Sequence, residues 1–157
     1  MATRKRNQSE NETARPRWGF IGSGKMASAL VKGMLRAGMA NPSEIAVSDP
    51  VEAARASLAS ETGVAAFDGN EPIVRRSQVL VLAVKPQSMP QVLIEIKPLI
   101  DRGHLIISIA AGISIETMAG GLEGHGRIIR VMPNTPALLG EGASAYAIGP
   151  EATPADE

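Results

Sequence analysis

The chain has 157 residues, which is long enough for one domain with a hydrophobic core. Its 16 basic residues balance its 16 acidic residues and only 3% are aromatic, so neither a nucleic acid nor a membrane surface is expected as a partner. The absence of cysteine excludes disulfides, thiolate metal sites and a cysteine nucleophile. No segment reaches the roughly 18 continuous apolar residues of a membrane helix, and we expect a cytoplasmic protein.

The first sixteen residues are polar and basic, and we predict that residues 1–16 form a disordered tail. Glu10 and Glu12 argue against a transit peptide, because such peptides avoid acidic residues. His104 and His125 each lie beside glycine in loop-like sequence, so we expect both to be exposed to solvent and neither to be catalytic.

Residues 18–27 read WGFIGSGKMA, an apolar strand that runs into the pattern Gly22-x-Gly24-x-x-Ala27. A strand, turn and helix in this order direct free backbone N–H groups and the positive end of a helix at one place, which suits a pyrophosphate. Gly22 permits the tight turn, Gly24 admits the phosphates and Ala27 allows close packing of helix on strand. We therefore predict a nicotinamide or flavin nucleotide site. The alternative is an ordinary βαβ unit with a glycine-rich corner.

The elements that follow fit this interpretation. A helix with Met26, Leu30, Met34 and Ala37 on its inner face ends near Gly38. A second strand over residues 45–48 is followed directly by an acidic residue, as is usual where the adenosine ribose binds.

Apolar runs then alternate with helical patterns. We predict a helix over 50–60 packed through Ala53, Ala54 and Leu58, a strand over 64–67, a helix over 71–76, a buried central strand over 79–84, a helix over 89–99, a strand over 105–110, a helix from 114 to 119, and strands over 127–131 and 143–148. This order predicts an α/β fold with a Rossmann-like, doubly wound, mostly parallel sheet and helices on both faces.

Ligands in such folds bind beyond the carboxyl ends of the strands, where three loops of this chain are unusual. Residues 85–87 read KPQ, residues 111–112 read AG and residues 132–136 read MPNTP. Proline fixes the backbone, and the bonds before Pro86 and Pro133 can adopt the cis form. Rigid loops here suit a cofactor head group, although prolines also simply end strands.

Together these motifs resemble the nucleotide-binding half of pyrroline-5-carboxylate reductase. The similarity covers about residues 17–150 and rests on GSGKMA at 22–27, AVKPQ at 83–87, SIAAGIS at 108–114, RVMPNTP at 130–136 and GEG at 140–142. The resemblance implies an enzyme that transfers hydride from NAD(P)H to the C=N bond of 1-pyrroline-5-carboxylate, a small imine acid, giving L-proline. The alternatives are a catalytically incomplete dinucleotide-binding module and another NAD(P)-dependent reductase of the same superfamily.

The resemblance also implies roles for individual residues. The pyrophosphate would be held by Gly22, Ser23, Gly24, Lys25 and Met26, and the adenosine ribose by Ser48 and Asp49. The middle of the cofactor would lie beside Ala83, Val84, Lys85 and Pro86, the nicotinamide ribose beside Ala110, Ala111 and Gly112, and the nicotinamide ring beside Met132, Pro133 and Asn134. No metal or side-chain nucleophile is required, and the proton donor is unassigned.

The coenzyme preference stays open at this point. The resemblance favours NADP(H), whereas the Asp49 carboxylate would repel a 2′-phosphate and so favours NAD(H). Ser48 and the nearby cation Arg55 would offset that repulsion.

Proteins of this kind continue after the nucleotide domain into a helical domain, through which they form homo-oligomers. The present sequence ends at Glu157, so we interpret 17–150 as the NAD(P)-binding domain and 151–157 as the start of a truncated connection to an absent helical domain.

Overall fold

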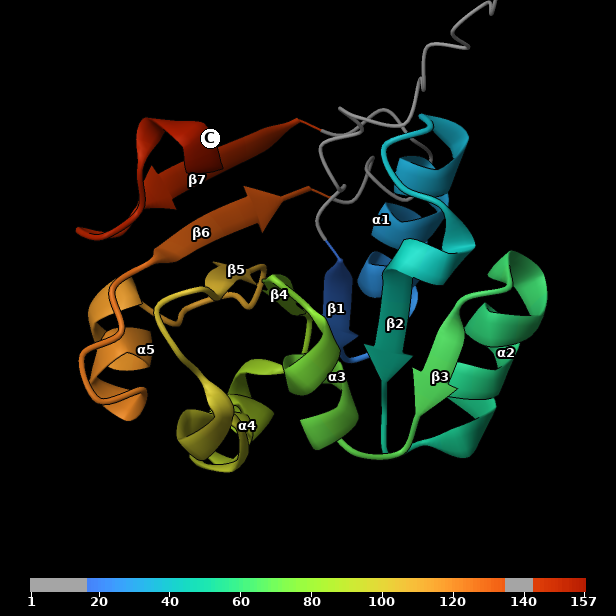
Figure 1. Ribbon diagram of the computed structural model, residues 1–157, viewed down its shortest axis with the longest axis horizontal. Helices are drawn as coiled ribbons and strands as arrows, with labels where there is room; N and C mark the ends of the chain where they lie inside the picture. The colour runs from blue at the N-terminus through green and yellow to red at the C-terminus, as the bar shows by residue number, and fades with distance from the viewer. Residues whose placement is uncertain (1–16, 135–142) are drawn as a thin grey trace, which may run out of the picture.

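The computed structural model describes residues 17–134 and 143–157. Within these ranges the strands form one seven-stranded sheet in the order β3-β2-β1-β4-β5-β6-β7 (Figure 1). The strands are β1 (Trp18–Ile21), β2 (Ile45–Ser48), β3 (Ala65–Phe67), β4 (Val79–Leu82), β5 (Leu105–Ser108), β6 (Ile128–Pro133) and β7 (Ser144–Ile148). All neighbouring pairs are parallel except β6 and β7, so the predicted doubly wound, mostly parallel sheet is confirmed.

The helices between the strands are α1 (Lys25–Arg36), α2 (Glu52–Thr62), α3 (Glu71–Arg76), α4 (Met89–Ile96) and α5 (Ile115–Gly121). Alternate residues of the strands point to opposite faces of the sheet, and each face carries its own core. Phe20 and Val47 pack with α1 and α2, whereas Ile21 and Leu80 pack with α3, α4 and α5. Helices therefore cover both faces, as the sequence predicts.

Strand β4 is the fourth of the seven and is buried along its whole length, which confirms the predicted central strand. It ends at Leu82 rather than at residue 84. Because β1 pairs with β2 on one side and β4 on the other, the order of the strands reverses at β1. The carboxyl ends of these three strands therefore flank the position where doubly wound folds bind ligands.

The predicted inner faces of two helices were partly wrong. In α1 Ala27 is buried and Leu30 and Met34 pack against the core as predicted, but the burial of Val31 was missed. Ala37 is exposed because it follows the last helical residue, Arg36. In α2 only Leu58 is buried and Ala53 is exposed, since this helix covers the edge of the sheet, where little strand surface remains.

Both histidines also differ from the expectation. His104 is buried; its Nδ1 accepts the Asp101 N–H, and its Nε2 lies 3.1 Å from the Val74 carbonyl oxygen. His125 is half-buried, and burial lowers its pKa. Neither histidine lies at the carboxyl ends of the strands.

Gly19 marks a tightly packed point of the core. A Cβ atom at this position would lie 2.5 Å from Cγ2 of Ile73 and 2.5 Å from Oγ of Ser77. Strand β1 can therefore approach α3 this closely only without a side chain at residue 19.

We expect Gly19→Ala to lower the free energy of unfolding by about 1 to 3 kcal/mol, the usual effect of overpacking a core. Gly33→Ala is the matched control, because Gly33 lies inside α1 with open space around its Cα, and this change should stabilise the chain by about 0.5 to 1 kcal/mol. Urea denaturation of both variants measures the difference. Equal stability of the two variants would contradict the packing argument.

Candidate dinucleotide-binding cleft

A cleft of about 740 Å³ lies at the carboxyl ends of the parallel strands, at the reversal point beside β1. Its walls come from the loops after β1, β2, β3 and β4 and from the first turns of α2 and α4. The predicted site residues that line it are Gly22, Gly24, Ser48, Asp49, Ala83, Val84 and Lys85. Segments far apart in the sequence, around Gly22 and around Lys85, therefore meet in one site.

The turn after β1 is held tightly against its two neighbouring strands. Gly22 has φ +100°, donates its N–H to the Ser48 carbonyl oxygen at 2.7 Å, and a Cβ there would lie 2.6 Å from the Ala83 carbonyl oxygen. Both the left-handed φ and the lack of space require glycine at this position.

Glycine suits the next glycine position of the turn for a different reason. Gly24 has extended backbone and nothing described lies within 4 Å of where its Cβ would be. The space over Gly24 opens into the cleft, so a ligand can come close to the backbone at this point.

The first turn of α1 has backbone N–H groups that are unpaired within the helix and can bind an anion. Among the described residues no side chain accepts a hydrogen bond at the N-cap, and the first turn contains no acidic residue. The N–H groups of a first helical turn lack partners within the helix, and the helix dipole places positive charge there. The hydroxyl of Ser23, in the β1–α1 turn just before this helix, is buried and has no partner in the described part of the chain. A pyrophosphate would supply the missing acceptors.

Asp49 anchors the glycine turn. Its Oδ2 accepts the Ser23 N–H at 2.8 Å and its Oδ1 accepts the Val51 N–H at 2.8 Å. The carboxylate therefore ties the β1–α1 turn to the β2–α2 turn across the floor of the cleft. Hydrogen bonds from N–H groups to a carboxylate are strong, so this contact sets the shape of the turn.

A polar network that the sequence analysis did not identify forms one wall of the cleft. Ser48 is buried and its Oγ donates to Oδ1 of Asn70 at 2.8 Å; Nδ2 of Asn70 donates to Glu95 at 2.7 Å, and Gln91 donates to the same carboxylate at 3.1 Å. Asn70 lies in the loop after β3. Polar residues directly after that strand are the sequence feature from which this wall of the cleft could have been predicted.

The other predicted residues follow β1, β4 and β5 or lie at the end of β6, at the same edge of the sheet, but do not line this cleft. They are Ser23, Lys25, Met26, Pro86, Ala110, Ala111, Gly112, Met132, Pro133 and Asn134. The bonds before Pro86 and Pro133 are trans. Residues 135–136 of the proline-rich loop and the GEG sequence at 140–142 lie outside the described residues. Contact of any site residue with a bound nucleotide stays a prediction.

Within the described ranges no group of three His, Asp or Glu side chains is placed to hold a metal ion, and no helix is long and apolar enough to cross a bilayer. The doubly wound sheet with a glycine turn at its reversal point defines the class of Rossmann-type nucleotide-binding domains. Residues 17–112 match the family described as NADP oxidoreductase, coenzyme F420-dependent, and the chain belongs to this family.

Two curated relatives are the pyrroline-5-carboxylate reductases of Methanosarcina acetivorans, at 44% identity, and Pisum sativum, at 41%. Each comparison covers 88% of this chain but only 51% and 50% of the respective relative. The chain thus spans about half the length of the curated relatives it matches.

Solved structures give the same result. The pyrroline-5-carboxylate reductase of Coxiella burnetii matches with a TM-score of 0.86 and 29% identity over 90% of this chain and 52% of that protein. The enzyme of Plasmodium falciparum, solved with NADP bound, matches with a TM-score of 0.79 and 31% identity over 90% of this chain and 51% of that one. The resemblance predicted from the motifs is confirmed.

We expect Gly24→Ala to leave the fold intact, because its Cβ would enter open space, and to weaken NADPH binding by about tenfold or more by keeping the phosphates from the backbone. Calorimetric titration measures the affinity and circular dichroism the melting temperature. Gly33→Ala, in the same helix but outside the cleft, should bind normally. Unchanged affinity in Gly24→Ala would contradict the placement of the pyrophosphate.

Proposed function

We propose that this chain provides the nucleotide-binding part of a pyrroline-5-carboxylate reductase. Its substrate would be a small imine acid, reduced at the C=N bond to L-proline. The observation that carries the proposal is the glycine turn with its uncapped helix, which opens into the cleft at the strand reversal of a chain 44% identical to such an enzyme. NADP(H) fits the turn through the free N–H groups of the first turn of α1.

In this proposal the bound nicotinamide coenzyme supplies the hydride, and the residues of the chain bind and orient it. The first turn of α1 binds the pyrophosphate, while Asp49 keeps the turn in the shape that exposes these N–H groups. Ala83 and Val84 give the cleft an apolar wall beside the middle of the coenzyme. Correct positioning of two reactants can contribute on the order of 7 to 11 kcal/mol to such a reaction.

We propose NADP(H) as the preferred coenzyme, with NAD(H) as the second candidate. The Plasmodium falciparum relative was solved with NADP bound. In this chain the Asp49 carboxylate already accepts two N–H groups, which reduces its capacity to bind ribose hydroxyls. The Arg55 guanidinium donates to the carbonyl oxygens of Asp49 and Pro50, and so brings positive charge beside the same turn.

We further propose a cytoplasmic protein that acts as a homo-oligomer, as the resemblance implies. Sedimentation of the purified chain at several concentrations measures its state of association.

The central experiment is a calorimetric titration with NADPH and NADH, followed in the same preparation by L-proline oxidation at alkaline pH. We expect binding of both coenzymes, tighter for NADPH. Oxidation of L-proline in the same preparation would show that the chain also catalyses the reaction alone. Binding without turnover would support a dinucleotide-binding module that is not catalytic alone. No binding of either coenzyme would overturn the proposal.

Asp49→Asn separates the anchoring role from direct coenzyme discrimination. An amide has one acceptor oxygen, so one of the two N–H partners of Asp49 would lose its acceptor, and we expect the affinities for NADPH and NADH to fall together by about tenfold. Asp68→Asn, which removes the same charge from the same cleft, should change either affinity by less than about threefold. A gain in NADPH affinity with a loss of NADH affinity in Asp49→Asn would instead show that the carboxylate discriminates against the 2′-phosphate.

A further inference from the structure

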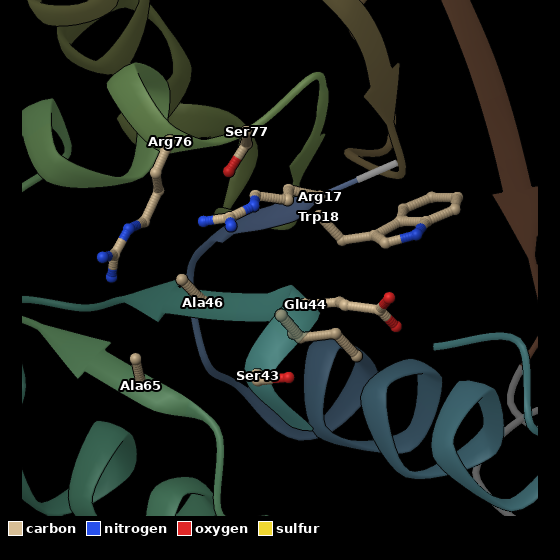
Figure 2. A pocket seen from close by; sticks show the side chains of 9 residues that line it. Arg17, Trp18, Ser43, Glu44, Ala46, Ala65, Arg76 and Ser77 are labelled. Carbon is tan, nitrogen blue, oxygen red and sulfur yellow. The ribbon is translucent and has the colours of Figure 1, made fainter. Parts of the chain in front are cut away.

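A second cavity lies at the opposite edge of the sheet, where the parallel strands begin. It has a volume of about 160 Å³ and is lined by residues at the starts of β1, β2 and β3 and at the end of α3 (Figure 2). This volume is well below the 300 to 1,000 Å³ that is typical of pockets for drug-sized ligands. Any occupant is therefore small.

Two arginines supply positive charge to this cavity. Arg17 comes directly before β1, and its backbone is fixed on both sides: its N–H donates to Oε1 of Gln78, and its carbonyl oxygen accepts the N–H groups of Gln78 and Val79. Arg76 is the last residue of α3, and its guanidinium lies 4.9 Å from the centre of the Phe67 ring. Both side chains therefore start from fixed positions.

In the described part of the chain neither of these guanidinium groups has a hydrogen bond or a carboxylate partner. The neighbouring Arg75, by contrast, pairs with Glu71 at 2.8 Å, and Arg127 pairs with Asp156 at 2.6 Å. Figure 2 shows the guanidinium groups of Arg17 and Arg76 extending toward the same side of the cavity. Two unpaired cations at one cavity attract a negatively charged ligand.

The cavity is also lined by one acidic residue, Glu44. Its carboxylate accepts the Asn41 N–H at 2.7 Å and so caps the turn before β2. In Figure 2 this carboxylate lies on the Trp18 side of the view, away from the two guanidinium groups. Glu44 therefore does not neutralise the two guanidinium groups.

The hydroxyl of Ser77 is a second, independent observation. Ser77 is only 5% exposed, its Oγ is buried, and no hydrogen-bond partner exists for it among the described residues. Burying a hydroxyl without a partner is unfavourable, so such a group normally indicates a missing acceptor or donor. The residue lines the cavity, and Figure 2 shows its hydroxyl on the side of the Arg17 guanidinium.

We propose that this cavity is a binding site for a small oxyanion, a phosphate or a carboxylate group, held between Arg17 and Arg76. Guanidinium groups bind both anions through paired N–H donors, and the Ser77 hydroxyl donates a further hydrogen bond. The site lies at the opposite end of the strands from the cleft, so its occupation is distinct from coenzyme binding.

The chain carries its own reporter, because Trp18 is its single tryptophan and lines the cavity. We would follow Trp18 fluorescence while titrating inorganic phosphate, and separately acetate, at constant ionic strength with chloride as the balancing anion. We expect a saturable change with half-saturation in about the millimolar range. Saturation by phosphate alone would identify a phosphate site, and saturation by acetate alone a carboxylate site. A response to both anions that equals the response to chloride would overturn the proposal.

Matched variants locate the effect. Arg76→Gln and Ser77→Ala should weaken the anion at least about tenfold and severalfold, respectively. Arg75→Gln removes the same charge one residue away, outside the cavity, and should bind normally, as should Gly24→Ala at the coenzyme cleft. Equal weakening in Arg75→Gln and Arg76→Gln would show a general charge effect and overturn the site. Ser77→Ala keeps the test valid if Arg76→Gln fails to fold.

Discussion

The structure depends on how closely β1 approaches its neighbours. Two positions require glycine for steric reasons: Gly19, inside the strand, leaves space for α3, and Gly22, directly after the strand, leaves space for the Ala83 carbonyl oxygen. Because β1 is held between β2 and β4 at these distances, the turn after it is fixed by backbone contacts rather than by its own sequence alone. The free N–H groups of α1 are thus presented in one position, as a preorganised anion site requires.

Asp49 has a role that connects this constraint to binding. A carboxylate directly after the second strand of such a fold usually binds the ribose hydroxyls of the nucleotide. Here both of its oxygens accept backbone N–H groups, one from each flanking turn. We therefore expect Asp49 to act on a coenzyme largely through the shape of the glycine turn, a contribution that its charge alone does not indicate.

Some features of this fold could be predicted from the sequence, and others could not. Strands and the glycine turn could be predicted because continuous apolar runs and glycine spacing are local signals, and β4 was correctly predicted as the central strand. In α1 the packing of Ala27 on the strand was correctly predicted, whereas Val31 was missed and Ala37 was wrongly included, because the spacing of apolar residues does not fix where the helix ends. The network from Ser48 through Asn70 to Glu95, and the burial of His104 against the Val74 carbonyl oxygen, join residues far apart in the chain, and no local pattern predicts such pairs.

The direction of the helices also gives the two edges of the sheet partial charges of opposite sign. In a parallel sheet the helices begin at the carboxyl ends of the strands and end at the amino ends, so one edge receives positive helix ends and the other negative ones. The last turn of α3 accordingly carries Arg75 and Arg76. Arg75 is neutralised within its own helix by Glu71, four residues earlier, whereas Arg76 extends into a cavity that also holds Arg17. Compensation of a helix dipole explains why a cation stands at this position, but it does not account for a second unpaired cation and a buried unpartnered hydroxyl beside it.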